Sequence, residues 1–423
     1  GMAPKMARMI CDDRIESFNF PQGVLSHMFG AVASRKPGVF SKTGLHTYID
    51  PRIEGGRMNE AARRAGQLVR VVELDGEEWL FWPRFHIDVA LVRGTTADTA
   101  GNITSEQEAA ILEGITIAQA AKACGGIVIA QAKYLAAKGT LDPRMVRIPG
   151  VCVDYVVIDP SQRQSVAGEY DPSLSGEVRI PLATIPPLEP GLRKIIARRA
   201  AMELFEGAVV NLGYGMPDGV ASVAAEMGLI DRITFTVEQG LVGGKPAGGV
   251  VFGSSHNPEA IIQEDYQFNF YDGGNLDIAF LGLAQADAAG NVNVSKVGRM
   301  LAGCGGFINI TQNARKVVFC GSFTAKGLEV QSGDGRLRIV REGEVRKLVA
   351  AVEQITFSGD YARRRRQPVL FVTERAVLEI RPEGLTVTEV APGVDLARDI
   401  LERMDFAPKV AGDLKLMDRA IFS

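Results

Sequence analysis

The stretch from residue 233 to residue 244, ITFTVEQGLVGG, places a carboxylate where it could do chemistry. Its β-branched and aromatic residues predict a buried strand, and that strand ends at Glu238. The glycines that follow, Gly240, Gly243 and Gly244, remove side chains where a substrate or backbone amides must approach a carboxylate. We therefore expect Glu238 to be exposed and rigidly held at the start of a loop.

Two more glycine-rich turns lie on either side of this stretch in the sequence. Residues 208–219, AVVNLGYGMPDG, predict a strand that opens at Gly213 and Gly215 before a helix begins, a layout suited to phosphate binding at a helix N-terminus. Residues 299–310, RMLAGCGGFINI, predict a third turn. Tight packing explains any one such turn as well as a ligand does, but three turns in one α/β unit favour a binding site.

The same glycines allow a dinucleotide-binding alternative. Gly213, Gly215 and Gly219 precede an acid at the end of the next strand, as in folds where that acid binds a ribose. Glu238 would then hold a nicotinamide cofactor and would not attack a substrate. The glycine spacing departs from G-x-G-x-x-G, Glu238 is followed by its own glycine cluster, and the two halves of the chain repeat each other, which all count against this alternative. The residue pattern alone leaves both interpretations of Glu238 open.

The chain also repeats itself. Residues 88–102, DVALVRGTTADTAGN, match residues 277–291, DIAFLGLAQADAAGN, which lie 189 positions later. Both copies are followed by a helical pattern and a buried strand. The repeat therefore predicts two related α/β halves.

The likeness between the halves extends upstream of this repeat. IESFNFPQG at residues 15–23 answers ITFTVEQG at residues 233–240. We therefore expect Gln22 to close a strand equivalent to the one that ends at Glu238, with the two strand ends facing each other. The second half carries a further strand, glycine loop and helix ahead of this point, so we expect the N-terminal unit to be incomplete.

Strands that alternate with helices predict the fold class. We expect an α/β protein of two related open domains with mostly parallel sheets and with ligands at the carboxyl ends of the strands. The length of 423 residues suits two or three units of ordinary domain size. We place an N-terminal domain over residues 1–160, a proline-rich linker over 161–192, and a C-terminal domain that contains Glu238 over 193–423.

Composition argues against several classes of protein. A net charge of −3 gives no general reason to expect nucleic acid or a membrane surface as a partner. No stretch offers the ~18 uninterrupted apolar residues of a membrane span. The five cysteines and four histidines show no zinc-ligand spacing, so we expect a cytoplasmic protein without metal and with reduced thiols. Cys304 lies in the third glycine turn, but no motif places a histidine to activate it, so we interpret it as a core residue.

The sequence resembles a known family. The run from VEQGLVGGKPAGG through YDGGNLDIAFLGLAQADAAGNVNVSKVGRMLAGCGGFINITQNARKVVFCGSF is similar to the C-terminal half of family I CoA-transferases, closest to the propionate and acetate CoA-transferases. The likeness extends from about Ile15 to the end of the chain, although the family's GGF-type glycine motif is absent from the first half. The resemblance implies that Glu238 is the covalent nucleophile. It also implies that Gln22, in the PQG motif, and the amides of Gly305 and Gly306 stabilise oxyanions.

The glycine turns and the resemblance together indicate where coenzyme A binds. Lys326 follows the VVFCGSFTA strand, where it could pair with a CoA phosphate, although an exposed lysine near a strand end often has no ligand. The residues that we expect to contact CoA are Gly213, Gly215, Gly303, Gly305, Gly306 and Lys326.

The resemblance implies a function as well. CoA would pass between a short-chain acyl-CoA (propionyl-, acetyl- or butyryl-CoA) and a free carboxylate such as acetate. The mechanism would be ping-pong through a glutamyl-CoA thioester, with coenzyme A as a substrate and no other cofactor. We expect a homo-oligomer, a dimer or tetramer, with no nucleic-acid or membrane partner. The alternatives are a nicotinamide-dependent oxidoreductase with a Rossmann-like second half, and a non-catalytic ligand-sensing protein of the same fold.

Overall fold

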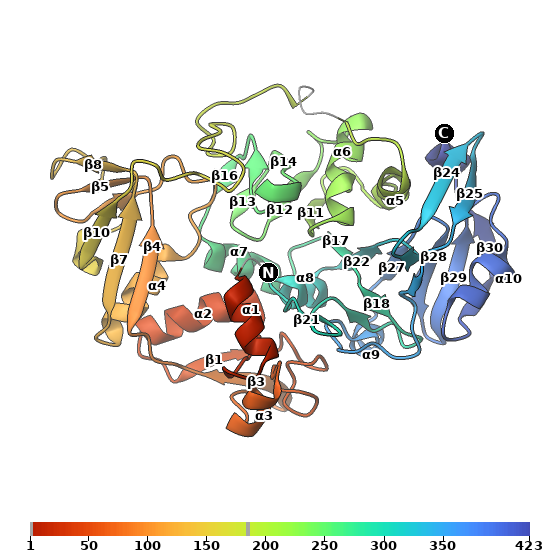
Figure 1. Ribbon diagram of the computed structural model, residues 1–423, viewed down its shortest axis with the longest axis horizontal. Helices are drawn as coiled ribbons and strands as arrows, with labels where there is room; N and C mark the ends of the chain where they lie inside the picture. Colours follow the sequence, from red (N-terminus) through yellow and green to blue (C-terminus); the bar gives the residue numbers. More distant parts are fainter. Residues whose placement is uncertain (1–2, 183–186) are drawn as a thin grey trace.

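The computed structural model describes residues 3–182 and 187–423, which form two α/β halves. Figure 1 shows the first half at the left and bottom, from red to yellow, and the second half from the centre to the right, from green to blue. Residues 183–186 of the predicted linker lie outside the described residues.

A ten-stranded sheet organises the second half. Its strand order is β16-β13-β12-β11-β17-β22-β27-β28-β29-β30. The five neighbours from β12 to β27 run parallel, as the alternation of strands and helices predicts. The strands are β11 (Val209–Leu212), β12 (Thr234–Val237), β13 (Leu241–Val242), β16 (Ala260–Ile261), β17 (Ile278–Gly282), β22 (Lys316–Cys320), β27 (Val369–Val372), β28 (Ala376–Arg381), β29 (Gly384–Val390) and β30 (Lys409–Leu416).

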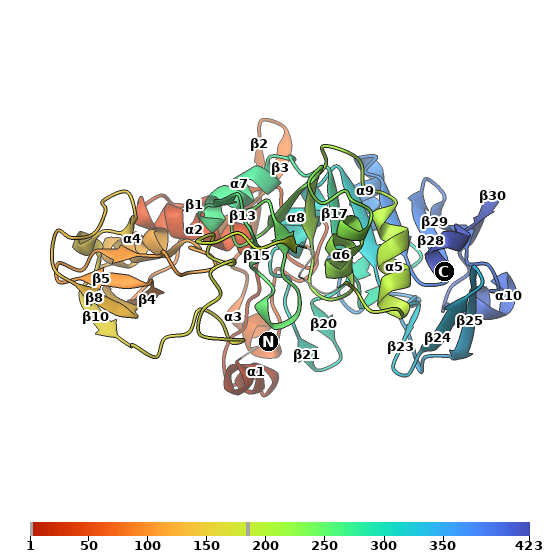
Figure 2. The same ribbon diagram turned by 90° about the horizontal axis from the view of Figure 1, so that it is seen from above.

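Helices cover both faces of the parallel part of this sheet (Figure 2). One face holds α5 (Leu192–Ala201) and α6 (Gly219–Glu226), and the other holds α7 (Glu264–Asp272) and α8 (Phe307–Asn313). The central strand β17 alternates between them, because Phe280 belongs to the α5–α6 core and Leu281 to the α7–α8 core. Burial on both faces explains why this strand is apolar throughout.

The first half is built on a smaller parallel sheet of order β10-β7-β4. Its strands are β4 (Val89–Arg93), β7 (Ile127–Ala132) and β10 (Tyr155–Ile158), and α4 (Gly114–Ala123) packs on one face. The opposite face is open to solvent in this structure, where Leu91 is 75% exposed and Tyr155 60%.

Short sheets and helices complete the first half. β2 and β3 form a hairpin that turns at Asp75 and Gly76, and both residues have positive φ as its turn requires. One sheet contains β1 (Gly38–Ser41), β3 (Glu77–Pro83) and β2 (Arg70–Leu74). Another contains β8 (Tyr134–Ala136), β5 (Thr96–Asp98), β6 (Ile103–Thr104) and β9 (Val146–Ile148). The remaining helices are α1 (Pro4–Cys11), α2 (Gln22–Ala33) and α3 (Glu60–Ala65).

The internal repeat forms the same strand-and-turn unit in each half. β4 and β17 are the repeated strands, and an aspartate closes the turn that follows each of them. Asp98 Oδ1 accepts hydrogen bonds from the backbone N–H groups two and four residues later, at 2.8 and 3.0 Å. Asp287 Oδ1 accepts the corresponding pair at 3.0 and 3.1 Å. The prediction of two related α/β halves is confirmed.

Gln22 does not close a strand, so that part of the prediction was wrong. The residues before it form an isolated bridge between Phe18 and Arg57, and α2 begins at Gln22 itself. Pro21, with φ of −58°, is a residue that favours a helix start. Beyond it, Val24 and other buried residues recur at helical spacing, and this period outweighs the short aromatic run upstream.

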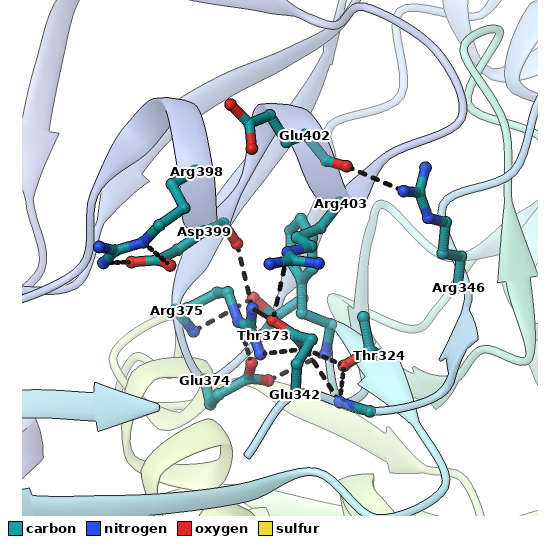
Figure 3. Close-up of polar contacts among 12 residues, drawn as sticks. Thr324, Glu342, Arg346, Thr373, Glu374, Arg375, Arg398, Asp399, Glu402 and Arg403 are labelled. Carbon is teal, nitrogen blue, oxygen red and sulfur yellow. Dashed lines mark hydrogen bonds and ion pairs between the residues drawn. The ribbon is translucent and has the colours of Figure 1, made fainter. Parts of the chain in front are cut away.

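Beyond β27, a buried ion network joins the turn that leads into β28 to the rest of the second half (Figure 3). Arg375 and Glu374 are both fully buried, and the Arg375 Nε donates to Glu374 at 2.5 Å. Nη1 of Arg375 donates to Glu342 at 2.7 Å and to the carbonyl of Asp399 at 3.0 Å. The network therefore connects the segment between β25 (Arg336–Arg341) and β26 (Val345–Arg346) with α10 (Leu396–Asp399).

Candidate active site

Glu238 lies directly after β12, at the carboxyl end of the parallel strands, where the sequence predicts it, but its side chain is partly buried and not exposed as expected. The neighbouring strands β11 and β17 run parallel to β12 and therefore end at the same edge. A cavity of about 280 Å³ opens at this edge, lined by Glu238, Gly213, Phe252 and residues 303–306. The sheet therefore presents a carboxylate to a cavity between glycine turns.

Two hydrogen-bond donors hold the Glu238 carboxylate. Gln239 Nε2 donates to its Oε1 at 3.2 Å, and the backbone N–H of Gly306 donates to the carboxylate as well. Burial raises the pKa of Glu238, and these two hydrogen bonds offset part of that rise because they stabilise the anion. Fixed protein dipoles thus replace much of the water around a potential nucleophile.

The third glycine turn leaves no room for side chains beside this carboxylate. Gly303 and Gly305 have φ of 76° and 51°, in the left-handed region that favours glycine. A Cβ on Gly306 would overlap Glu238 Oε2 and would lie 3.0 Å from the Phe268 ring. The close approach of backbone to carboxylate explains why this turn contains several glycines.

The first half reaches the site through the start of α2. The Gln22 backbone N–H donates to the carbonyl of Gly305 at 2.9 Å, and the Cys304 N–H donates to Asn19 Oδ1, also at 2.9 Å. Nε2 of Gln22 donates to Oε1 of Glu264. Gln22 and Glu238 therefore lie on two sides of one glycine turn, although Gln22 arrives there on a helix.

Gln22 and Glu238 line different cavities. Gln22 lines a second cavity, of about 580 Å³, together with Gln239 and Glu264. Phe252 lines both cavities and packs edge-on against Tyr214, with ring centroids 5.3 Å apart. Phe252 is therefore a wall that the two cavities share.

The structure brings four of the six predicted CoA-binding residues to Glu238. The glycines that line its cavity are Gly213, Gly303, Gly305 and Gly306. Gly215 stands outside that lining, and its carbonyl accepts a hydrogen bond from Arg193 Nη2 at 3.0 Å. Lys326 is exposed in the turn between β23 (Thr324–Ala325) and β24 (Glu329–Gly333), also outside the lining. Neither of these two residues is placed beside Glu238.

Sequence reasoning missed two carboxyl groups near the site, those of Glu264 and Glu113. Glu264 is the first residue of α7 and is 2% exposed. Burial, followed by the neighbouring carboxyl of Glu113, raises the pKa of Glu264 to about 10. An acid in the first turn of a helix is ordinarily an exposed group that complements the helix dipole, so the sequence held no signal of this burial.

Cys304 is a core residue, as the sequence analysis favoured. It is 5% exposed, and burial raises the pKa of its thiol to about 12. A thiol with so high a pKa carries almost no thiolate at neutral pH, and the thiolate is the nucleophilic form. Glu238 is therefore the better candidate for a nucleophile in this cavity.

The described part of the chain contains neither a metal-binding cluster nor a membrane-spanning helix. Across residues 3–182 and 187–423, no three His, Cys, Asp or Glu side chains are grouped so that they could hold a metal ion. Over the same two ranges, no helix combines the length and the apolar character needed to cross a membrane. The cysteines Cys11, Cys124, Cys152, Cys304 and Cys320 are free thiols.

Comparison with known proteins defines the class to which this site belongs. Residues 3–159 match the family described as coenzyme A transferase. The caffeate CoA-transferase of Acetobacterium woodii is 50% identical over 100% of this chain and 82% of its own length. The acetate CoA-transferase YdiF of Escherichia coli K12 is 42% identical over 100% of this chain and 79% of its own length. The chain belongs to the coenzyme A transferase family.

A solved structure agrees with this assignment. The acyl-CoA transferase YdiF of E. coli O157:H7, in a thioester complex with CoA, matches with a TM-score of 0.94 at 40% identity. The match covers 100% of this chain and 80% of the other. The enzyme described here is an acyl-CoA:carboxylate CoA-transferase with coenzyme A as a substrate. These comparisons give no support to the oxidoreductase alternative.

Proposed function

We propose that Glu238 carries the CoA group during the transfer. The position of its carboxylate supports this role, since it lies at the end of β12 and lines the cavity between the glycine turns. Hydrogen bonds from Gln239 and the Gly306 N–H fix its orientation. A fixed, poorly solvated carboxylate can attack a thioester carbonyl.

The proposed reaction is a series of carbonyl substitutions. The Glu238 carboxylate attacks the acyl-CoA carbonyl and the C–S bond breaks, which gives an acyl-glutamyl anhydride and CoA thiolate. The thiolate then attacks the glutamyl carbonyl, the bond from that carbon to the bridging oxygen breaks, and the first acid leaves as its carboxylate. Glu238 now holds CoA as a thioester. The second carboxylate reverses these steps and leaves as the new acyl-CoA.

Each tetrahedral intermediate carries an oxyanion that hydrogen-bond donors can stabilise. The Gly306 N–H already donates to the Glu238 carboxylate, so we assign it to the oxyanion that forms on the glutamyl carbon. The Gln22 amide has two N–H groups, and Glu264 accepts from one of them. We assign the other to the oxyanion that forms on the acyl carbon, with the backbone of Gly305 placing Gln22 beside the site.

We propose a short acyl chain as the preferred substrate. The relatives named above act on caffeate and on acetate, so the family alone does not fix the acid. The apolar lining of the Glu238 cavity, which includes Leu212, Leu281 and Val294, supports propionyl-, acetyl- or butyryl-CoA as the donor and acetate as the acceptor. Initial rates with these donors and with caffeoyl-CoA test the assignment. A preference for caffeoyl-CoA would contradict it.

A cytoplasmic location and a homo-oligomeric state, dimer or tetramer, also belong to the proposal. The five free cysteines support a reducing compartment. Light scattering of the purified protein tests the oligomeric state, and a monomeric mass would contradict that part.

Intact mass spectrometry tests the central assignment. After incubation with propionyl-CoA alone, the protein should gain a covalently bound CoA on the peptide that contains Glu238. Borohydride should reduce this thioester, and the Glu238→Gln variant should form no adduct. An adduct on Cys304, or no adduct in an enzyme that turns over, would contradict the proposal.

A further inference from the structure

Three helix N-termini converge beside the active site. α2 begins with Gln22, α7 begins with Glu264, and Glu113 is the N-cap residue of α4. α2 packs against both α4 and α7, and the three side chains line one cavity. One amide and two carboxyl groups therefore meet where the two halves are in contact.

Glu264 is buried between two polar partners. Its Oε1 accepts a hydrogen bond from Gln22 Nε2, and its carboxyl is also hydrogen-bonded to Glu113. Glu264 is buried and Glu113 is partly buried, and two carboxyl groups in contact resist double ionisation, so the pair retains a proton at neutral pH. Burial and the Glu113 carboxyl both raise the pKa of Glu264, to about 10, in agreement with a retained proton.

The position of the shared proton determines whether Glu264 donates or accepts in its hydrogen bond with Gln22. Gln22 Nε2 can only donate, so the Glu264 oxygen that faces it is an acceptor, and we place the retained proton on the side of the pair between Glu264 and Glu113. A half-turn of the Gln22 amide would bring its oxygen against that acceptor, which is unfavourable. The contact therefore fixes which end of the amide faces Glu264 and leaves the second N–H for another partner.

We propose that Glu264 is a positioning residue, whose buried carboxyl holds the Gln22 amide so that one N–H is turned toward the substrate oxyanion. This inference rests on the proposed function, in which Gln22 stabilises that oxyanion. Glu264 does not touch the reacting atoms and acts through Gln22. Since the carboxyl pair holds a proton, it also places less negative charge near Glu238 than two ionised groups would.

A double-mutant cycle tests the inference. Glu264→Ala removes the acceptor, and we expect kcat to fall on the order of 10-fold while KM for acyl-CoA changes less than about two-fold, because the affected interaction is made mainly in the transition state. In the Gln22→Ala background, the same substitution should lower kcat by less than about two-fold, because no amide is left to position.

Two further variants separate positioning from a structural role. Glu264→Gln keeps an oxygen that accepts from Gln22 and gains an NH₂ that donates to Glu113, so its kcat should lie within about three-fold of wild type. Asp265→Ala is the matched control, because Asp265 is the next carboxylate of α7 and accepts from the N–H of Tyr266. That variant should retain wild-type kcat and KM.

Several outcomes would overturn the inference. They are a multiplicative loss of kcat in the double variant, wild-type kcat in Glu264→Ala, or Glu264→Gln as slow as Glu264→Ala. If Glu264→Ala does not fold, Glu264→Leu takes its place in the cycle, since leucine fills the space without an acceptor. The CoA adduct distinguishes this inference from the proposed function. If the wild type forms the adduct on Glu238 and Glu264→Ala keeps wild-type kcat, only the positioning role is contradicted. If the wild type is active but forms no such adduct, the proposed function itself is contradicted.

Discussion

The two copies of the internal repeat build the same turn in different surroundings. In both, an asparagine at the end of the turn accepts a hydrogen bond from a distant glycine, Asn102 from Gly150 at 2.9 Å and Asn291 from Gly359 at 3.0 Å. In the described first half, however, β4 ends a three-stranded sheet, whereas β17 lies within ten strands between β11 and β22. The turn depends on local sequence, and the chemistry depends on the neighbouring strands.

The strands beside β17 supply the cavity-lining residues that the turn itself lacks. β11 leads into Gly213 and β12 leads into Glu238, and both positions line the cavity beside the second copy. The first half contributes Gln22 from a helix, across the contact between the halves. The comparison therefore predicts unequal effects of mutations in the two halves.

We expect the largest effect on turnover from substitution of Glu238, which lies beside the second copy of the repeat. Glu238→Gln should abolish turnover, because an amide cannot form the anhydride. Glu238→Asp should lower kcat on the order of 100-fold, because one methylene fewer misplaces the nucleophile. Steady-state kinetics measures both, with intact mass excluding deamidation of the glutamine. Near-normal turnover in the verified Glu238→Gln variant would count against a covalent role.

The contribution of the first half should be smaller. Gln22→Ala should lower kcat by roughly 100-fold with little change in KM for acyl-CoA, as expected for a lost oxyanion donor. Gln22→Glu should be worse despite its similar shape, because a third carboxyl group would then face Glu264 and Glu238. If Gln22→Glu matches wild type in the same assay, the first half has no oxyanion role at this position.

Mutations in the turns themselves should affect stability alike in both halves. Asp98→Ala and Asp287→Ala each remove carboxylate hydrogen bonds to partly buried backbone N–H groups, so each should cost about 1–3 kcal/mol of unfolding free energy. Urea unfolding of the two variants tests this equivalence. A large cost at one position and none at the other would break the structural comparison between the copies.

The smallest expected effect is a shift in pH dependence. Since burial raises the pKa of Glu238, kcat/KM should fall, as pH decreases, at a value above that of an ordinary glutamate, because the protonated acid cannot attack. Gln239→Leu removes a donor that stabilises the anion, so this acid limb should move to still higher pH. A shift to lower pH would show that Gln239 does not stabilise the carboxylate.

Local signals account for the features that the sequence predicted well. The apolar run of β12 and the glycines after it place Glu238 at a strand end, and an offset of 189 residues identifies the two copies. Alternation along a strand, glycine in a turn and direct repetition are all properties of neighbouring residues. These local preferences persist in the folded protein because the tertiary contacts favour the same conformations.

Contacts between distant residues account for what the sequence did not predict. Gln22 and Glu264 are 242 positions apart, and no periodic pattern indicates that they meet. The prediction of a strand before Gln22 was wrong because a short aromatic run does not distinguish a strand from other structure. Pro21 and the helical spacing of the buried residues after it favour α2 instead. The place of Lys326 after a strand suggests a CoA contact, yet Lys326 is exposed and does not line the Glu238 cavity.

The hydrogen bond from Gln22 to Gly305 has a consequence for motion between the halves. Together with the hydrogen bond between Asn19 and Cys304, it places a contact between the two halves at the glycine turn beside Glu238. A hinge opening would therefore move Gln22, the proposed oxyanion donor, away from Glu238, which would remain intact in its own half. Hydrogen–deuterium exchange at the Gln22 amide would report such opening directly. A molecule that binds between the two halves and separates them should inhibit the enzyme without occupying the Glu238 cavity.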